Sequence, residues 1–212
     1  MYIPASFREG KIERLHDLIM KHPLGLLVTH GDGGLEASPI PFLLYPDEGE
    51  FGTLRAHMAR ANPHWKLLVD QVECLIAFQG VDGYVTPSWY PSKAEHHKAV
   101  PTWNYATVQA RGIATVTEDA AWLRRLLDDL TTHHERPRPQ PWSVGDAPAD
   151  YISNQMKAII GIEIPIGRID GKWKMSQNKD DADRAGVIAG FSAFIDPHQN
   201  DLVADMVRQG VR

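Results

Sequence analysis

Apolar residues recur at helical spacing in several stretches of the chain, and each stretch predicts a helix. In residues 8–22, Ile12, Leu15 and Ile19 fall on one face, and Pro23 ends the pattern. Further helices are expected at 63–70, 117–134, 149–157, 180–190 and 196–208.

Apolar runs bounded by turn residues predict the strands. Residues 24–29 and 35–45 read as a hairpin around the glycine-rich turn 30–34. Pro39 and Pro41 in the return strand have no N–H to donate, so this strand should lie at an edge or carry a bulge. Further strands are expected at 50–55, 73–79, 103–116 and 158–169, with turns at 46–49 and 170–171.

This order of elements predicts a mixed fold that is mainly β. Short hairpin connections favour an antiparallel barrel with helices packed outside it over a doubly wound parallel sheet. Residues 80–100 have too little periodicity for a regular element, and long loops of this kind are often functional. Residues 135–142 form a proline-punctuated connector that we expect to be extended.

Composition indicates an ordinary globular protein. The chain has 212 residues, 43% hydrophobic and 23% charged, which suits a single domain. No apolar run reaches the roughly 18–20 residues that span a bilayer, and the first residues lack the pattern of a signal peptide. The single cysteine, Cys74, cannot form an internal disulfide. We therefore expect a cytoplasmic protein with no membrane contact.

The charge of the chain bears on its partners. Its net charge is −5, and no helix-turn-helix with a basic recognition helix is evident, so direct DNA binding by this chain alone is disfavoured. One stretch departs from this acidic balance. Residues 55–66 carry the following basic or potentially basic side chains without an intervening acid: Arg55, His57, Arg60, His64 and Lys66.

The same stretch leads from a predicted strand into a predicted helix. Asn62 is a good N-cap, and Pro63 suits the first helical turn. A strand end that brings cations to a helix start can receive a phosphate group. The alternative is a solvated basic surface patch.

Other kinds of site have little support. The adjacent histidines at 96–97 and 133–134 would diverge on a strand or a helix, so a shared metal ion is disfavoured. Cys74 lies among apolar neighbours, which disfavour a thiolate. The chain has no Gly-x-Ser-x-Gly elbow, no P-loop and no Gly-x-Gly-x-x-Gly motif.

Aromatic residues gather around the predicted long loop. Trp89-Tyr90 and Trp103-Asn104-Tyr105 flank it, and Trp173 lies between two lysines. These rings can serve core or interface packing. They can also form a wall for a flat heteroaromatic ligand, oriented by Ser88, Asn104 and Gln177. Phosphate-type and aromatic-type features on one chain suit flavin mononucleotide, FMN.

Four segments resemble the PaiB family, described as FMN-binding negative transcriptional regulators. They are residues 57–65, 86–93, 100–105 and 171–178, and the opening segment 2–7 also fits. The resemblance implies an FMN-binding split β-barrel of the antiparallel six-stranded type, with peripheral helices and a C-terminal helical extension. It also relates the chain to pyridoxamine-phosphate oxidases and flavin reductases, and it implies a homodimer with two flavin sites at the subunit interface.

The resemblance also implies which residues bind the cofactor. Arg60 would take the role of a phosphate-binding lysine, and His57 stands where a hydroxyl is usual. Lys172-Trp173-Lys174 resembles a segment that reaches the flavin from the partner subunit. The full predicted set is Ser38, Arg55, His57, Met58, Ala59, Arg60, Ser88, Trp89, Lys172, Trp173, Lys174 and Gln177. No catalytic acid or base stands out.

We therefore predict a single domain over 1–212, with a barrel core at about 8–170 and a C-terminal segment at 171–212. One functional interpretation is a transcriptional regulator that binds FMN and acts indirectly or through a protein partner. The alternative is a flavin-dependent oxidoreductase. A dimeric scaffold that has lost its flavin would leave the basic stretch without a purpose.

Overall fold

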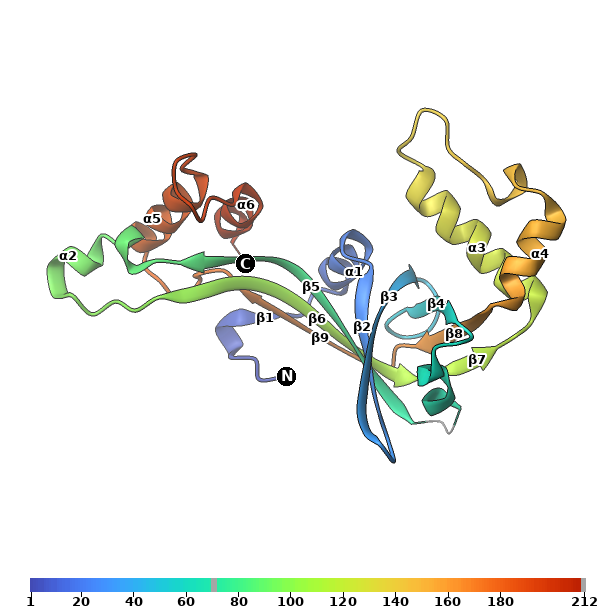
Figure 1. Ribbon diagram of the computed structural model, residues 1–212. Coiled ribbons are helices and arrows are strands. Elements are labelled where there is room, and N and C mark those ends of the chain that lie inside the picture. Colours follow the sequence, from blue (N-terminus) through green and yellow to red (C-terminus); the bar gives the residue numbers. More distant parts are fainter. Residues whose placement is uncertain (70–71, 211–212) are drawn as a thin grey trace. The chain divides into compact units, whose positions relative to one another are not determined.

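The computed structural model describes residues 1–69 and 72–210, and the chain forms two compact units (Figure 1). Unit 1 contains residues 1–18, 79–109 and 170–212, and unit 2 contains 19–78 and 110–169. The prediction of one domain over the whole chain stays a prediction.

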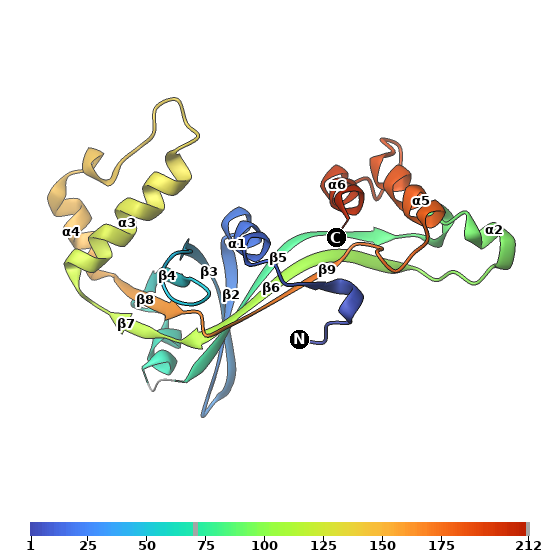
Figure 2. The ribbon, with the colours of Figure 1, turned by 180° about the vertical axis from the view of Figure 1, so that it is seen from behind.

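Unit 1 is built on the strands β1 (Arg8–Glu9), β9 (Arg168–Lys174), β6 (Thr102–Ile113) and β5 (Glu73–Val85), in this order. β1 runs antiparallel to β9. The helices of this unit are η1 (Ala5–Phe7), η3 (Pro87–Trp89), α2 (Ser92–His96), α5 (Asp181–Ser192) and α6 (Asp201–Gln209), and α1 (Ile12–Lys21) begins here. α5 and α6 lie side by side in both ribbon views (Figures 1 and 2).

Alternation along β5 places a helix layer on one face of the unit 1 strands. Gly83 and Val85 are buried, while Tyr84 between them is only partly buried. Phe191 of α5 lies so close to Gly83 that an added Cβ would be 2.6 Å from its ring. The helices therefore cover the Gly83 face of these strands.

Unit 2 continues from β5 through β2 (Leu24–Gly31), β3 (Gly34–Tyr45), β4 (Thr53–Ala59), β8 (Ile159–Pro165) and β7 (Thr115–Thr117), in this order. The described pairs are antiparallel. α3 (Ala120–Glu135) and α4 (Ala149–Lys157) are its main helices, with η2 (Pro63–Leu68) and η4 (Val144–Asp146) in the connections. Its core is aliphatic and aromatic, with Leu27, Phe42, Leu54, Ile76, Phe78 and Ile162 almost fully buried.

The predicted hairpin is confirmed, but β3 lies between β2 and β4 and is not an edge strand over its whole length; only its proline stretch has a single neighbour. Pro39 and Pro41 pair with β2, and pairing with β4 begins only at Phe42. The prolines therefore lie where the missing N–H has no neighbouring strand to bind. The helices α3 and α5 lie close to their predicted positions, and the first and last helices are present but begin four and five residues later than predicted.

Other predictions were wrong in detail. The expected loop over 80–100 is partly regular, because β5 continues to Val85 and two short helices follow. The expected turn at 170–171 lies inside β9, and the first helix begins at Ile12 instead of residue 8. The helix expected at 63–70 is a 3-10 helix ending at Leu68, and its predicted last residue, Asp70, lies outside the described residues. The described residues form nine strands where six were expected.

None of the helices in the described ranges 1–69 and 72–210 combines the length and the apolar character that crossing a bilayer requires.

Candidate functional site

The predicted cofactor-binding residues divide evenly between the two units. Ser38, Arg55, His57, Met58, Ala59 and Arg60 lie in unit 2, and Ser88, Trp89, Lys172, Trp173, Lys174 and Gln177 lie in unit 1. The two halves are described in turn.

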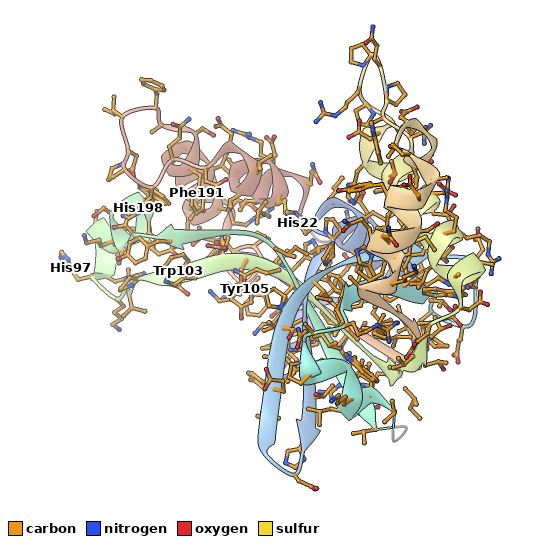
Figure 3. The ribbon with its side chains drawn as sticks, turned by 45° about the vertical axis from the view of Figure 1, so that its right-hand side comes forward. His22, His97, Trp103, Tyr105, Phe191 and His198 are labelled. Atoms are coloured by element: carbon orange, nitrogen blue, oxygen red, sulfur yellow. The ribbon has the colours of Figure 1, made fainter. Side chains whose placement is uncertain are left out.

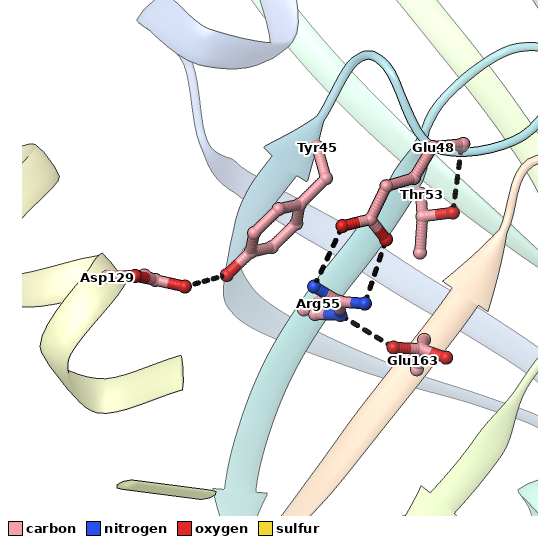
Figure 4. A network of polar contacts seen from close by, with 6 residues as sticks. All are labelled: Tyr45, Glu48, Thr53, Arg55, Asp129 and Glu163. Carbon is pink, nitrogen blue, oxygen red and sulfur yellow. Dashed lines mark hydrogen bonds and ion pairs between the residues drawn. The ribbon is translucent and has the colours of Figure 1, made fainter. Parts of the chain in front are cut away.

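Arg55 is held by two carboxylates on the outer face of β4 (Figure 4). Its Nε donates to Glu163 Oε2 on β8 at 2.6 Å, and its two terminal nitrogens donate to Glu48 at 3.2 and 2.8 Å. The guanidinium also lies 4.2 Å from the centre of the Tyr45 ring. Side chains alternate between the two faces along β4. Because the neighbours of Arg55 point into the core, Arg55 itself points outward.

The same network reaches helix α3. The Tyr45 hydroxyl donates to Asp129 Oδ2 at 2.6 Å. Burial, followed by this hydrogen bond, raises the pKa of Tyr45 to about 12. We call Tyr45, Glu48, Arg55, Asp129 and Glu163 the Arg55 clamp. The clamp joins β3, β4 and β8 to α3 through charges distant in sequence, so no local motif predicted it.

Arg60 is also engaged. Its Nε donates to the carbonyl of Lys157 at 2.9 Å, and its Nη2 donates to the carbonyl of Ile159 at 3.4 Å. Its Nη1 lies 2.9 Å from Glu118 Oε2. Arg60 therefore binds the chain where α4 ends and β8 begins. A phosphate at Arg60 would compete with Glu118, and the predicted phosphate contact stays a prediction.

Ser38 belongs to a buried polar relay. His64 lies 2.8 Å from the Ser38 hydroxyl through Nδ1 and 2.8 Å from the Thr29 hydroxyl through Nε2. Burial lowers the pKa of His64, while the charge of Glu36 opposes this shift. Asn62 accepts from the backbone N–H of His64, which confirms the predicted N-cap. The relay fixes the turn after β4 against the hairpin.

The remaining residues of this half lie along β4. Burial lowers the pKa of His57, and its Nδ1 is buried without a hydrogen-bond partner among the described residues. Met58 is in the core, and Ala59 is exposed at the end of the strand. This imidazole nitrogen, three residues before Arg60, can accept or donate one further hydrogen bond.

Unit 1 contains a cluster of unpaired lysines, Lys172, Lys174 and Lys179. Lys174 Nζ donates to Thr102 Oγ1 at 2.6 Å and to the carbonyl of Trp103 at 2.5 Å. Burial, then the charges of Lys172 and Lys179, lower the pKa of Lys174. None of the three lysines has an ion-pair partner among the described residues. We call them the lysine cluster.

Aromatic rings accompany the lysine cluster. Lys172 Nζ lies 5.1 Å from the centre of the Tyr105 ring, and Lys179 Nζ lies 4.3 Å from the centre of the Tyr90 ring. Trp103 and Tyr105 alternate with the buried Asn104 on β6 and therefore share one face of the strand (Figure 3). Sequence reasoning missed Lys179, although it follows Lys174 closely.

A strained turn fixes the end of β9 and so the position of Lys174. Ser176 is buried with a positive φ of 62°, which costs about 1 kcal/mol for a residue other than glycine. Its hydroxyl is within 3.1 Å of both polar atoms of the Asn104 amide. The Gln177 side chain accepts from Met175 N and donates to the Trp173 carbonyl. Gln177 therefore braces its own turn.

Two predicted tryptophans are used in packing. Trp89 lies against Phe191 with ring centres 4.8 Å apart, and its Nε1 donates to Asp196 Oδ2 at 3.1 Å. Trp173 is 6% exposed. Ser88 follows the N-cap Thr86, whose hydroxyl accepts from the Ser88 N–H. A contact of these residues with a flavin stays a prediction.

The lysine cluster suits FMN chemically. Three lysines without carboxylate partners offer ammonium N–H donors for phosphate and carbonyl oxygens, and a tyrosine ring beside them offers an aromatic surface. The clamped arginines of unit 2 offer fewer free donors. On the chemistry of the donor set, the residues present fit the cofactor.

Comparison with known proteins relates the chain to flavin-binding proteins. Residues 1–168 match the sequence family described as "Putative FMN-binding domain". An uncharacterized protein of Aspergillus fumigatus is 39% identical, over 90% of this chain and 90% of its own. The protease synthase and sporulation protein PAI 2 of Bacillus subtilis is 28% identical, over 95% of this chain and 94% of its own.

A solved structure gives the fold. The FAD and heme binding protein of Mycobacterium smegmatis matches with a TM-score of 0.58 and 23% identity, over 86% of this chain and 80% of that one. At this identity the match concerns the fold alone. The predicted class, a mixed fold of the flavin-binding split-barrel type, is confirmed despite the larger number of strands.

Proposed function

The chain belongs to the PaiB-like family of FMN-binding domains, with FMN as its cofactor, and we propose that it is a PaiB-type negative transcriptional regulator. The lysine cluster is the single observation on which the proposed binding of an anionic cofactor rests. The charges of Lys172 and Lys179 disfavour the ammonium group of Lys174, and an anion bound beside Lys174 would offset this repulsion in a chain of net charge −5.

Lys172, Lys174 and Lys179 are the residues of unit 1 that we propose to hold FMN. Tyr105, beside Lys172, offers its ring to the flavin, and the Ser176 turn keeps Lys174 in place. When bound, FMN supplies a redox-active ring system and a phosphate group. The lysines supply positive charge and hydrogen-bond donors, and Lys174 still has one N–H beyond the two already used.

We propose that regulation is indirect or uses a protein partner. The acidic composition gives no broad basic surface for phosphate neutralisation along DNA. The name of the Bacillus subtilis relative, protease synthase and sporulation protein PAI 2, supports a regulatory role of this kind.

A second function, a flavin-dependent oxidoreductase, is favoured by the same lysines. Positive charge near a flavin stabilises the negative charge that the reduced ring carries. Bleaching of bound FMN by NADPH under anaerobic conditions would support this alternative. A flavin that stays oxidised would leave regulation as the better proposal.

The proposal includes a homodimer in a cytoplasmic setting. Leu24 and Leu26 on β2 are 64% and 41% exposed, and they pair with Pro41 and Pro39 on β3. Exposed apolar strands of this kind are typical of interfaces. Light scattering of the wild type and of Leu26→Lys tests the dimer, with Leu35→Lys at the hairpin tip as the control. A wild type of monomer mass at micromolar concentration would contradict it.

The cofactor site is tested by titrating protein into FMN and into riboflavin while following flavin fluorescence. We expect Lys174→Gln to weaken FMN about tenfold or more and riboflavin much less, because the variant removes a charged phosphate partner. Arg60→Ala tests the turn of unit 2 in the same way, and Lys93→Gln is the matched control. Equal losses for FMN and riboflavin would place the phosphate away from the substituted residue.

A further inference from the structure

A pocket in unit 1 is chemically unlike the lysine cluster. It has a volume of about 480 Å³ and is lined by Asp82, Gly83, Tyr84, Trp103, His198, Gln199 and Asn200. Pockets of roughly 300–1,000 Å³ are usual for small ligands. No lysine or arginine is among these lining residues.

Three aromatic side chains form the walls of the pocket. Tyr84 and Trp103 meet edge to face with ring centres 5.9 Å apart, and His198 lies 4.8 Å from Tyr84. They come from β5, from β6 and from the segment between α5 and α6, and Figure 3 labels Trp103 and His198. Trp103 is 52% exposed although it is a large apolar residue. An exposed indole beside two further rings is typical of a binding surface.

The polar edge of the pocket is rich in acceptors. Asp82 uses its Oδ2 to accept from Gln79, which leaves Oδ1 without a described partner. Gln199 donates its amide to Asp201, so its carbonyl oxygen is available. Asp196 accepts from the His198 N–H and from Trp89 Nε1, so it adds negative charge beside this segment but offers no unused oxygen. A ligand with hydrogen-bond donors or positive charge is therefore favoured here.

The frame of the pocket is fixed before any ligand binds. The Asn200 amide donates to the carbonyl of Asp82 at 3.0 Å, and its oxygen caps α6 by accepting from Val203 N. This bond joins the His198 segment to the edge of β5. The aromatic walls therefore keep their positions, which lowers the entropic cost of binding.

We propose that this pocket binds an organic ammonium ion, with the rings of Tyr84, Trp103 and His198 around the cation and Asp82 as its counter-ion. Cations are attracted to the faces of Trp and Tyr rings, and quaternary ammonium groups are bound by aromatic cages of this kind. FMN fits the pocket poorly, because its phosphate and ring carbonyls are acceptors that would face carboxylates. The proposal therefore assigns the ammonium ion and the flavin to different residues, and the two sets adjoin at β6, where Lys174 binds the backbone carbonyl of Trp103.

The test uses choline chloride and its neutral isostere 3,3-dimethylbutan-1-ol, titrated calorimetrically into the full chain at matched ionic strength. Each titration is run with FMN-free and FMN-loaded protein. We expect saturable choline binding at millimolar concentration, and binding of the alcohol about tenfold weaker or more. Equal binding of the two ligands, or no saturable binding of choline, would overturn the proposal.

Substitutions of pocket residues test where choline binds. Asp82→Asn should weaken choline about fivefold or more and leave the alcohol unchanged, because the variant removes only the charge. Trp103→Leu should abolish choline binding, and Trp103→Phe should restore part of it. Trp142→Leu is the matched control, since this tryptophan is 46% exposed in unit 2. Loss of choline binding in the control and not in Trp103→Leu would overturn the assignment.

Choline titrations with and without FMN distinguish a failure of this proposal from a failure of the proposed function. Choline binding that is the same with and without FMN supports two independent sites, and it would stand even if FMN bound elsewhere in the chain. Competition between choline and FMN would assign the pocket to the flavin and overturn the ammonium site.

Discussion

The Arg55 clamp gives the most direct test of whether a predicted cofactor-binding cation serves the stability of the fold or the binding of FMN. Arg55 is one of the predicted cofactor-binding residues, and its guanidinium forms ion pairs with Glu163 and Glu48. We predict that Arg55→Met lowers the free energy of unfolding and leaves FMN affinity within about twofold. The substitution keeps much of the side-chain length and removes the charge.

The size of the expected stability loss follows from how exposed the paired side chains are to solvent. The side chains of Arg55, Glu163 and Glu48 are 22%, 30% and 45% exposed, so each ion pair contributes only about 0.2–1 kcal/mol. The contact of the guanidinium with the Tyr45 ring adds about 0.5–1 kcal/mol. The two carboxylates left without a cation repel each other and Asp129. We therefore expect a loss of about 2 kcal/mol, or about 4–8 °C in Tm for a chain of this size.

Urea unfolding followed by circular dichroism measures the loss, and flavin fluorescence measures FMN affinity on the same samples. Arg125→Met on α3 is the matched control, because this exposed arginine has no ion pair among the described residues. Glu163→Gln should reproduce part of the effect. Unchanged stability together with a selective loss of FMN over riboflavin would refute the structural role and place Arg55 at the phosphate.

Three further predictions concern stability and reactivity. The pKa of Tyr45, raised to about 12 from 10.0, means that its stabilising effect is complete below pH 10 and is lost as the pH rises toward 12. The stability difference between wild type and Tyr45→Phe should therefore shrink over this range in alkaline urea titrations, and a constant difference would contradict the assigned bond to Asp129. Gly190→Ala places a Cβ 2.2 Å from the Trp89 ring and should cost about 1–3 kcal/mol in urea unfolding. Gly33→Ala, with nothing within 4 Å, is its control, and equal effects would refute the close approach. Cys74 is 1% exposed, and burial raises its pKa to about 11, so Ellman's reagent should label it at pH 8 only after unfolding. Rapid labelling of the native protein would contradict this burial.

Local patterns predicted most of the regular structure. The hairpin at β2 and β3, the edge prolines and the helix α3 follow from apolar periodicity and turn residues, which act over a few neighbouring positions. The segment 80–100 was misjudged, since its strand is stabilised by packing against α5, far away in sequence. The prediction of a turn at Asp170 and Gly171 failed for the same kind of reason. Pairing with a strand that is distant in sequence keeps these residues in β9.

The sequence alone determined the family, the cofactor and most of the helices and strands, because motifs and periodicity are local properties. Only the tertiary structure decided which cations have carboxylate partners among the described residues. Arg55 and Arg60 receive carboxylates from Glu163 and Glu118, whereas the lysine cluster receives none from the described residues. The rings of Tyr84, Trp103 and His198 likewise meet only in the folded chain. Charge pairing and ring contact depend on distance in space, and spacing along the chain does not fix that distance.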